Sequence, residues 1–204
     1  MKLLLTSAGI KNESIRDALV DLLGKPIGES DALCIPTATY GHPWTGPGEA
    51  WRFISGREPR CPMCELGWKS LGVLELTALP SIGAERWVPW VRETNVLLVN
   101  GGDALYLCHW MRQSGLAELV PSLEDTVWVG LSGGSMVMTP GSERTSSAGG
   151  RPQAMTRHWG SSTSRSSLTW TTRTCRRTRW PTLNGGLSES PARPMRSTTR
   201  PRSR

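Results

Sequence analysis

The sequence lacks any apolar run long enough to cross a membrane, and it lacks a glycine-rich phosphate loop. These absences exclude an integral membrane protein and a P-loop nucleotide enzyme. The first residues could be mistaken for a secretion signal, but their apolar core is limited to residues 3–5, which is too short. Five cysteines, an odd number, without a secretion signal are typical of a protein of the reducing cytoplasm.

Metal ligands are scarce as well. The chain has one C-x-x-C motif, formed by Cys61 and Cys64, and no further ligands at the spacing of a zinc site. A redox motif is expected at the start of a helix beside a strand, a condition that this segment meets only loosely. The pattern therefore favours two reduced structural cysteines, and we expect neither a metal nor another cofactor.

Residues 140–204 contain no Val, Ile, Phe, Tyr, Lys or Asp. Their 13 basic residues are all arginine and are opposed only by Glu143 and Glu189, which gives a net charge of +11. Residues 1–139, in contrast, carry a net charge of −4. A segment with the composition of residues 140–204 cannot bury enough apolar surface to offset the entropy that it loses on ordering. We therefore expect an incomplete folded domain over residues 1–139 and a disordered tail over residues 140–204.

Two interpretations of this tail differ in their consequences. A natural basic tail would bind nucleic acid or another acidic partner, but such tails usually mix lysine with arginine or repeat a short unit. Alternatively, the tail is translated out of frame from about Pro140 onward. With one choice of codons, residues 165–172 regroup one base earlier to I-F-P-H-L-D-H, and neighbouring segments regroup to further strand-like runs. Because the codons can be chosen freely, some apolar residues are certain to appear in the regrouped frame, but strand-like runs are not. The sequence therefore favours the frameshift, and nucleic-acid binding is not expected.

Apolar periodicity in residues 1–139 predicts strands that alternate with helices. Strands are expected at 1–7, 31–36, 73–78, 95–99 and 127–131, helices between Asn12 and Gly24 and around 62–71, 84–93 and 104–114, and a long loop at 39–60. Apolar strands that alternate with helices imply an α/β fold with a parallel, doubly wound sheet. Functional sites in such sheets lie beyond the carboxyl ends of the strands.

The most informative segment follows the last of these strands. Residues 130–134 read Gly-Leu-Ser-Gly-Gly, a G-x-S-x-G pattern between an apolar strand and an apolar helix. The pattern is typical of a sharp strand-to-helix turn that exposes a nucleophilic serine, here Ser132. The neighbours must be small because the turn is strained. The same pattern also occurs by chance in ordinary glycine-serine loops, so a second motif is needed to support the interpretation.

That second motif is Asn-Gly-Gly-Asp-Ala-Leu-Tyr-Leu at residues 100–107, at the end of the preceding expected strand. With both motifs in this order, residues 1–139 resemble the dipeptidase E (α-aspartyl dipeptidase) family of serine peptidases, which is related to cyanophycinase. The resemblance implies a class I glutamine-amidotransferase-like α/β fold, truncated here at its C-terminus. It also implies that Ser132 is the nucleophile and that the chain is built to hydrolyse short peptides in the cytoplasm.

Backbone amides near Ser132 are expected to form the oxyanion hole of such an enzyme. The resemblance favours the amide of Gly133 together with that of Gly101 or Gly102. Gly133 departs from the family, in which alanine is usual; glycine keeps the amide but is expected to loosen the turn. Asp103 can either cap the following helix or line the site, and the cap is favoured.

The expected catalytic histidine is missing from this chain. In the family it follows the elbow in a P-H segment after the next strand, which exists here only in the regrouped reading. The histidines present are His42, His109 and His158, and none matches the family's pattern. Because a serine hydroxyl is a weak nucleophile without an adjacent base, we expect little or no peptidase activity from this chain.

Two other functions are weighed against a peptidase. A non-catalytic α/β binding protein with a nucleic-acid-binding tail would bind with a steep salt dependence. An amidotransferase-like enzyme with a cysteine nucleophile is disfavoured, because the elbow carries Ser132. No membrane partner is expected, and the sequence indicates neither the peptide specificity nor the oligomeric state.

Overall fold

A computed structural model describes residues 1–139 of the chain; the predicted tail, including the regrouped segments and His158, lies outside the described residues. The described part is built on one five-stranded sheet in the order β1-β5-β4-β2-β3, and every pairing in it is parallel. The strands are β1 (Lys2–Thr6), β2 (Asp31–Ile35), β3 (Ser70–Val73), β4 (Val96–Val99) and β5 (Val127–Leu131). The predicted α/β class with a parallel sheet is confirmed.

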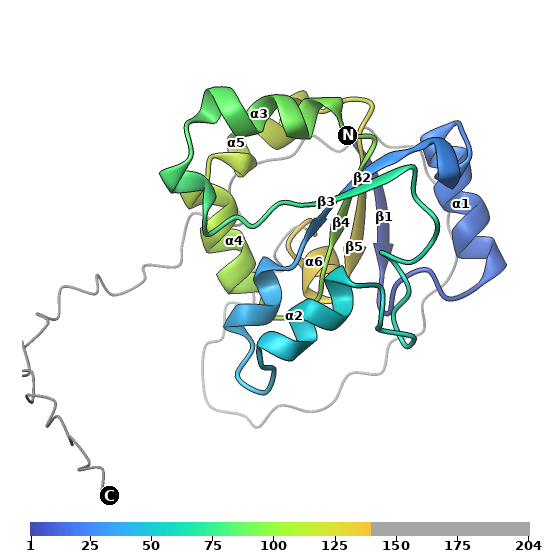
Figure 1. Ribbon diagram of the computed structural model, residues 1–204, viewed down its shortest axis with the longest axis horizontal. Helices are drawn as coiled ribbons and strands as arrows, with labels where there is room; N and C mark the ends of the chain where they lie inside the picture. Colours follow the sequence, from blue (N-terminus) through green and yellow to red (C-terminus); the bar gives the residue numbers. More distant parts are fainter. Residues whose placement is uncertain (140–204) are drawn as a thin grey trace, which may run out of the picture.

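Helices cover both faces of this sheet, as Figure 1 shows. They are α1 (Glu13–Leu23), α2 (Pro47–Ile54), α3 (Ala84–Glu93), α4 (Ala104–Gln113), α5 (Leu116–Leu119) and α6 (Gly133–Met136). Short 3-10 helices add η1 (Ile27–Glu29), η2 (Thr37–Gly41), η3 (Leu79–Ser81) and η4 (Val120–Ser122). Helix α1 packs on one face, whereas α3, α4 and α5 pack on the other. Within residues 1–139, no helix is long and apolar enough to cross a membrane.

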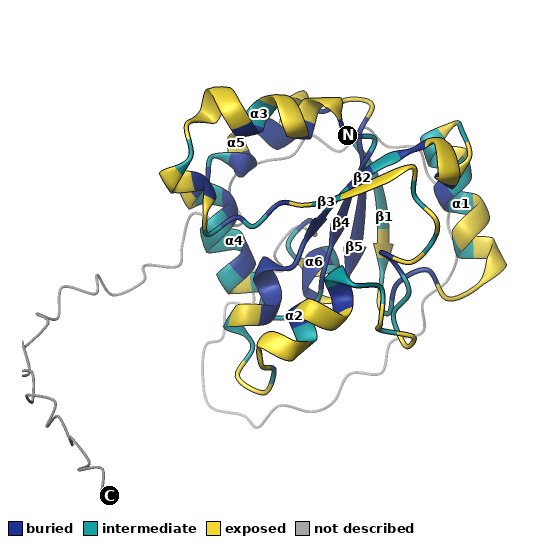
Figure 2. Ribbon diagram, viewed as in Figure 1, coloured by how far each residue is buried: buried dark blue, intermediate teal, exposed yellow. Residues whose placement is uncertain are grey.

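The central strand β4 shows why an inner strand of this sheet is apolar throughout. Its four residues are all buried, and they alternate between two hydrophobic cores. Leu97 and Val99 face the core beneath α3 and α4, whereas Val96 and Leu98 face the core that includes α1. Figure 2 shows the buried inner strands β4 and β5 between helices that are exposed on their outer sides, whereas much of the edge strand β3 is exposed. A strand with two covered faces has no polar side, as expected for a doubly wound sheet.

The start and stop signals of α1 act as the sequence predicts. The Asn12 side chain caps the first turn by accepting a hydrogen bond from the Ile15 amide at 2.9 Å. Gly24 ends the helix in the left-handed conformation, with φ of 70°, and its amide bonds back to the Val20 carbonyl. Both caps are local, which is why a single sequence suffices to predict them.

The segment between β2 and α3 differs from the prediction. The expected loop at 39–60 contains the helix α2, which begins at Pro47 and buries Phe53. The expected helix around 62–71 is absent from the structure, and residues 62–69 are irregular. A left-handed glycine at Gly67, with φ of 83°, interrupts any helix there. The third strand spans Ser70–Val73 and shares only Val73 with the expected strand at 73–78.

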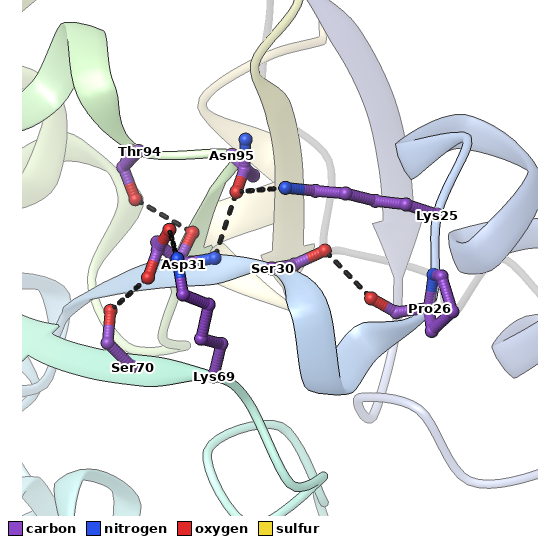
Figure 3. A network of polar contacts seen from close by, with 8 residues as sticks. All are labelled: Lys25, Pro26, Ser30, Asp31, Lys69, Ser70, Thr94 and Asn95. Carbon is purple, nitrogen blue, oxygen red and sulfur yellow. Dashed lines mark hydrogen bonds and ion pairs between the residues drawn. The ribbon is translucent and has the colours of Figure 1, made fainter.

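A polar network joins three strands at their amino ends, opposite to the edge where the nucleophile is expected (Figure 3). The Asn95 side-chain oxygen accepts hydrogen bonds from the Asp31 amide at 2.9 Å and from the Lys25 ammonium at 2.8 Å. The Thr94 hydroxyl donates to the Asp31 carbonyl at 2.9 Å. These bonds satisfy backbone groups where the strands begin, and they fix β2 beside the start of β4.

The Asp31 carboxylate should make the fold slightly sensitive to acid. The Ser70 hydroxyl donates to it at 2.7 Å and the Lys69 ammonium at 3.2 Å, and these bonds lower the pKa of Asp31 below its ordinary value of 3.8. Because the folded pKa is depressed, this contribution is present at neutral pH and is lost as the pH falls below 3.8 through the folded value. Asp31→Asn should therefore lower the urea midpoint at pH 7, and the difference from the parent should shrink below pH 3.8. A difference that is independent of pH would contradict this assignment.

Candidate active site

Ser132 lies at the turn between β5 and α6, at the carboxyl edge of the sheet. Its φ of 47° makes it the one non-glycine residue with a positive φ in the described part of the chain. Its side chain makes no capping bond to α6, and the residue is exposed. Such a conformation costs free energy and persists only where the surroundings hold it. The geometry is therefore that of an elbow that presents a hydroxyl to solvent.

Two glycines allow α6 to lie directly on the strands. A Cβ on Gly130 would lie 2.6 Å from the Gly134 carbonyl oxygen, and a Cβ on Gly134 would collide with the Val99 carbonyl of β4. The buried Trp128 indole donates to the Gly134 carbonyl at 3.0 Å and holds this close approach. The first and last positions of the G-x-S-x-G pattern thus serve packing, and they fix the position of the serine between them.

The end of β1 fastens the elbow from the other side. The Thr6 amide donates to the Ser135 hydroxyl at 3.0 Å, and that hydroxyl donates to the Thr6 carbonyl at 2.8 Å. The same carbonyl accepts from the Ser132 amide at 3.0 Å, and the Thr6 hydroxyl donates to the Gly130 carbonyl at 2.9 Å. The sequence gave no sign of this role of Thr6. A threonine that ends the first strand is the one local signal that could have indicated it.

The loop after β4 comes to within contact distance of the elbow. A Cβ on Gly101 would lie 3.2 Å from the Ser132 Cβ, so the absence of a side chain lets the two loops touch. The Asn100 side chain fixes this loop: its oxygen accepts from the Gly101 amide at 2.8 Å, and its amide nitrogen donates to the Thr39 hydroxyl at 2.8 Å. That hydroxyl donates to the Gly101 carbonyl at 3.2 Å. The two sequence motifs therefore meet in space.

The three candidate oxyanion donors differ in their availability. The Gly101 amide is already engaged by Asn100. The amides of Gly102 and Gly133 make no hydrogen bond within residues 1–139, and a Cβ on Gly133 would lie 3.1 Å from the Gly102 nitrogen. Of the two glycines that the sequence offered as partner to Gly133, Gly102 is the one whose amide makes no hydrogen bond within residues 1–139.

Gly133 is required here for a reason that the sequence does not reveal. A Cβ at this position would lie 2.5 Å from the Gly102 carbonyl oxygen. Glycine at 133 permits a close approach of the loop after β4, and the expected loosening of the turn stays a prediction. The alanine that is usual at this position would require the Gly102 loop to move away.

Asp103 acts as a helix cap rather than as a site-lining group. Its carboxylate accepts hydrogen bonds from the Leu105 amide at 2.8 Å and from the Tyr106 amide at 2.9 Å, at the first turn of α4. The Asp103 amide donates to the Ala38 carbonyl at 2.9 Å. The favoured sequence interpretation is confirmed, and the carboxylate is occupied in fixing the loop that approaches Ser132.

No histidine hydrogen bonds to the Ser132 hydroxyl among the described residues. The His42 ring accepts a hydrogen bond from the Trp44 amide at 3.3 Å through Nδ1. His109 lies in α4 with its ring edge-to-face against Trp110, at a centroid distance of 5.3 Å. Residues 1–139 also contain no group of three or more His, Cys, Asp or Glu side chains that could hold a metal ion. The described part of the site therefore offers a serine and two amides, without a base in place.

Comparisons with known proteins give a match to one family and to a solved structure. A family model described as peptidase family S51 matches residues 3–160. Among solved structures, a protein described as a peptidase E from Listeria monocytogenes EGD-e matches with 21% sequence identity and a TM-score of 0.47, over 68% of this chain and 61% of that chain. The chain thus spans about three fifths of the length of that structure. No curated protein gives a match.

Proposed function

The chain belongs to peptidase family S51, and we propose on that premise that its site is that of a serine-type peptidase acting on short peptides. The observation that carries the proposal is the strained, exposed Ser132 at the carboxyl edge of the sheet, beside two amides without partners in residues 1–139. Backbone strain confined to one non-glycine residue is typical of a functional site. Three sets of contacts hold the Ser132 turn in place. They come from β1, from β4 with the loop that follows it, and from Trp128.

The geometry supports a division of roles in peptide hydrolysis. Ser132 Oγ would attack the scissile carbonyl carbon, and the negative oxygen of the tetrahedral intermediate would accept hydrogen bonds from the Gly133 and Gly102 amides. A general base must take the hydroxyl proton and then deliver it to the leaving amine. Gly101 contributes by lacking a side chain, because a larger residue would push the loop away from Ser132.

We further propose that the chain as printed has little or no activity, because this base is missing. An unactivated serine hydroxyl is almost fully protonated at neutral pH and attacks carbonyl groups slowly. Neither His42 nor His109 hydrogen bonds to Ser132. In the regrouped frame the segment F-P-H-L-D-H would supply the histidine that the dipeptidase E resemblance requires.

The partner and compartment follow from the same proposal. The expected partner is a short peptide rather than a nucleic acid or a membrane. We propose the cytoplasm as the compartment because the five cysteines of the chain are an odd number and cannot all pair with one another. No contact of the described residues favours nucleic-acid binding as a second function.

The test compares two proteins that differ only after Pro140. The chain as printed and a chain with the reading frame restored by a one-base change are assayed for amine release from a panel of short peptides. The restored chain should cleave some of these peptides, and the printed chain should cleave none. Turnover by the printed chain that disappears with Ser132→Ala would overturn the proposed impairment. A restored chain that folds but cleaves nothing would overturn the peptidase proposal itself.

A further inference from the structure

The outer edge of β1 has no partner strand within residues 1–139, because β1 pairs only with β5 and lies at the end of the sheet. The inner strands β4 and β5 are buried at every residue, whereas β1 is only partly buried (Figure 2). Its Leu5 is 36% exposed. An apolar strand with an open edge is a template for pairing with another strand.

The hydrogen bonds of β1 show which of its backbone groups face this open edge. The Lys2 amide donates to the residue before β5 at 3.1 Å, and the Thr6 carbonyl accepts from the residue after β5 at 3.0 Å. In a parallel pair, every second residue directs both of its backbone groups to the same neighbour, so Lys2, Leu4 and Thr6 face β5. The amides and carbonyls of Leu3 and Leu5 therefore point outward, and no hydrogen bond to another segment of residues 1–139 uses them.

We propose that this edge binds a second copy of the printed chain, by antiparallel pairing of the two β1 strands about a two-fold axis at Leu4. This register pairs the whole strand, Lys2–Thr6, with its copy. Leu3 then lies opposite Leu5 of the second copy, and the pair exchanges both of its N–H···O bonds. Because the symmetry repeats this pair, every outward amide and carbonyl of Leu3 and Leu5 is used. The proposal is independent of the peptidase proposal, since it does not involve Ser132.

The side chains of β1 suit this register on both faces of the sheet. Leu3 packs against the core on the face away from α1, and Leu5 points to the same face. Opposite residues of an antiparallel pair project on one face, so the exposed Leu5 would pack against Leu3 of the second copy. The one charged residue of β1, Lys2, lies on the other face and donates to the Leu22 carbonyl of α1 at 2.7 Å. It would lie opposite Thr6 of the second copy, so the pairing brings no like charges directly opposite each other.

The other edge of the sheet, formed by β3, is less suited to pairing. That strand has four residues, with Gly72 among them. A glycine weakens a strand, and a lysine beside an edge hinders association. Lys69 immediately precedes β3, and its side chain is 61% exposed. Leu71 of β3 is nevertheless 39% exposed, close to the value for Leu5, which makes it a matched position for a control.

Antiparallel pairing would keep the two candidate active sites apart. Ser132 lies at the carboxyl edge of the sheet, and antiparallel β1 strands direct the carboxyl edges of the two copies in opposite directions. The joined sheet would therefore carry one elbow at each of its two ends, and neither elbow would be covered by the pairing itself.

The oligomeric state of the full printed chain tests the proposal. Sedimentation equilibrium over a range of protein concentrations should show a dimer. Leu5→Lys should raise the dissociation constant of the dimer by about tenfold or more, because it removes a leucine from both pairs and places two lysines about 7–8 Å apart. Leu71→Lys, the same substitution on the edge of β3, should leave the dissociation constant unchanged. Far-UV circular dichroism establishes that both variants fold.

A single cysteine tests the register. At the two-fold axis, Leu4 faces its own copy as a non-hydrogen-bonded pair with Cα atoms about 4.5 Å apart, which is within the range of a disulfide. On mild oxidation, Leu4→Cys should link two copies through residue 4, and mass spectrometry should find that peptide joined to its own copy. A dimer in which this linkage does not form would overturn the proposal.

Three other results would also overturn it. The first is a parent chain that is monomeric, including a monomer whose Leu3 and Leu5 amides are protected from hydrogen exchange, since another segment of the same chain would then cover the edge. The second is a dimer that Leu5→Lys does not weaken. The third is a dimer that Leu71→Lys weakens as much as Leu5→Lys does.

Discussion

Replacing Ser132 by alanine in the frame-restored chain is expected to lower kcat/KM for short peptides by about 10⁴- to 10⁶-fold, because nucleophile and base act as a unit. The loss follows from the removal of the one exposed hydroxyl held at the elbow, beside the Gly102 and Gly133 amides. Residual hydrolysis would come from those amides alone. Initial rates over a range of peptide concentrations measure the effect, with the chain as printed serving as the comparison that lacks the base.

Two further substitutions separate chemistry from stability. Ser14→Ala removes a hydroxyl that is exposed in the first turn of α1, and kcat/KM should be unchanged. Ser132→Gly should abolish turnover as completely as alanine does, without lowering the free energy of unfolding, because glycine adopts the positive φ of 47° without strain. A Ser132→Ala protein that retains substantial turnover would contradict the assignment of the nucleophile.

The part of the fold that the sequence predicts is the part that depends on local patterns. The strand β5 is predicted to the residue, since it is apolar throughout and ends at a glycine-serine turn. The caps of α1 and the Asp103 cap of α4 are likewise local. Two short motifs, each at the end of a buried strand, predicted the family, and the match of the peptidase family S51 model to residues 3–160 confirms it.

The contacts that hold the site depend on the topology instead. Thr6 and Ser135 are 129 residues apart, and they meet because β1 pairs with β5 at the edge of the sheet. Likewise, Thr39 reaches the Gly101 loop because β2 and β4 are neighbours. Neither Thr6 nor Thr39 belongs to a motif. A single sequence therefore cannot predict which hydrogen bond each of these threonines makes.

The choice between Gly101 and Gly102 illustrates the same limit at smaller scale. Adjacent glycines in a loop are equivalent in the sequence, but here the amide of Gly101 donates a hydrogen bond to the Asn100 side-chain oxygen.

The wrong prediction of a helix over residues 62–71 has a related cause. That segment is apolar enough for a helix, but its residues pack against the chain after β1, and Gly67 turns the backbone away.

The second large effect is expected for Gly134→Ala, which should lower the free energy of unfolding by about 3 kcal/mol because overpacking against rigid backbone is costly. The new Cβ would collide with the Val99 carbonyl and would lie 2.9 Å from that of Asn100, and neither can move without displacing β4 or its loop. Urea unfolding followed by tryptophan fluorescence measures the change.

Gly48→Ala is the matched control, because it is the same substitution in a helix where the glycine has nothing within 4 Å. Alanine favours the helical conformation and restricts the unfolded chain, so this variant should gain about 0.5–1 kcal/mol. The two variants should therefore differ in sign. Equal changes in the free energy of unfolding would mean that helix propensity, rather than contact with β4, controls the effect of alanine at position 134. Opposite effects would show that the close approach of α6 to β4 excludes a side chain at position 134, two residues after Ser132.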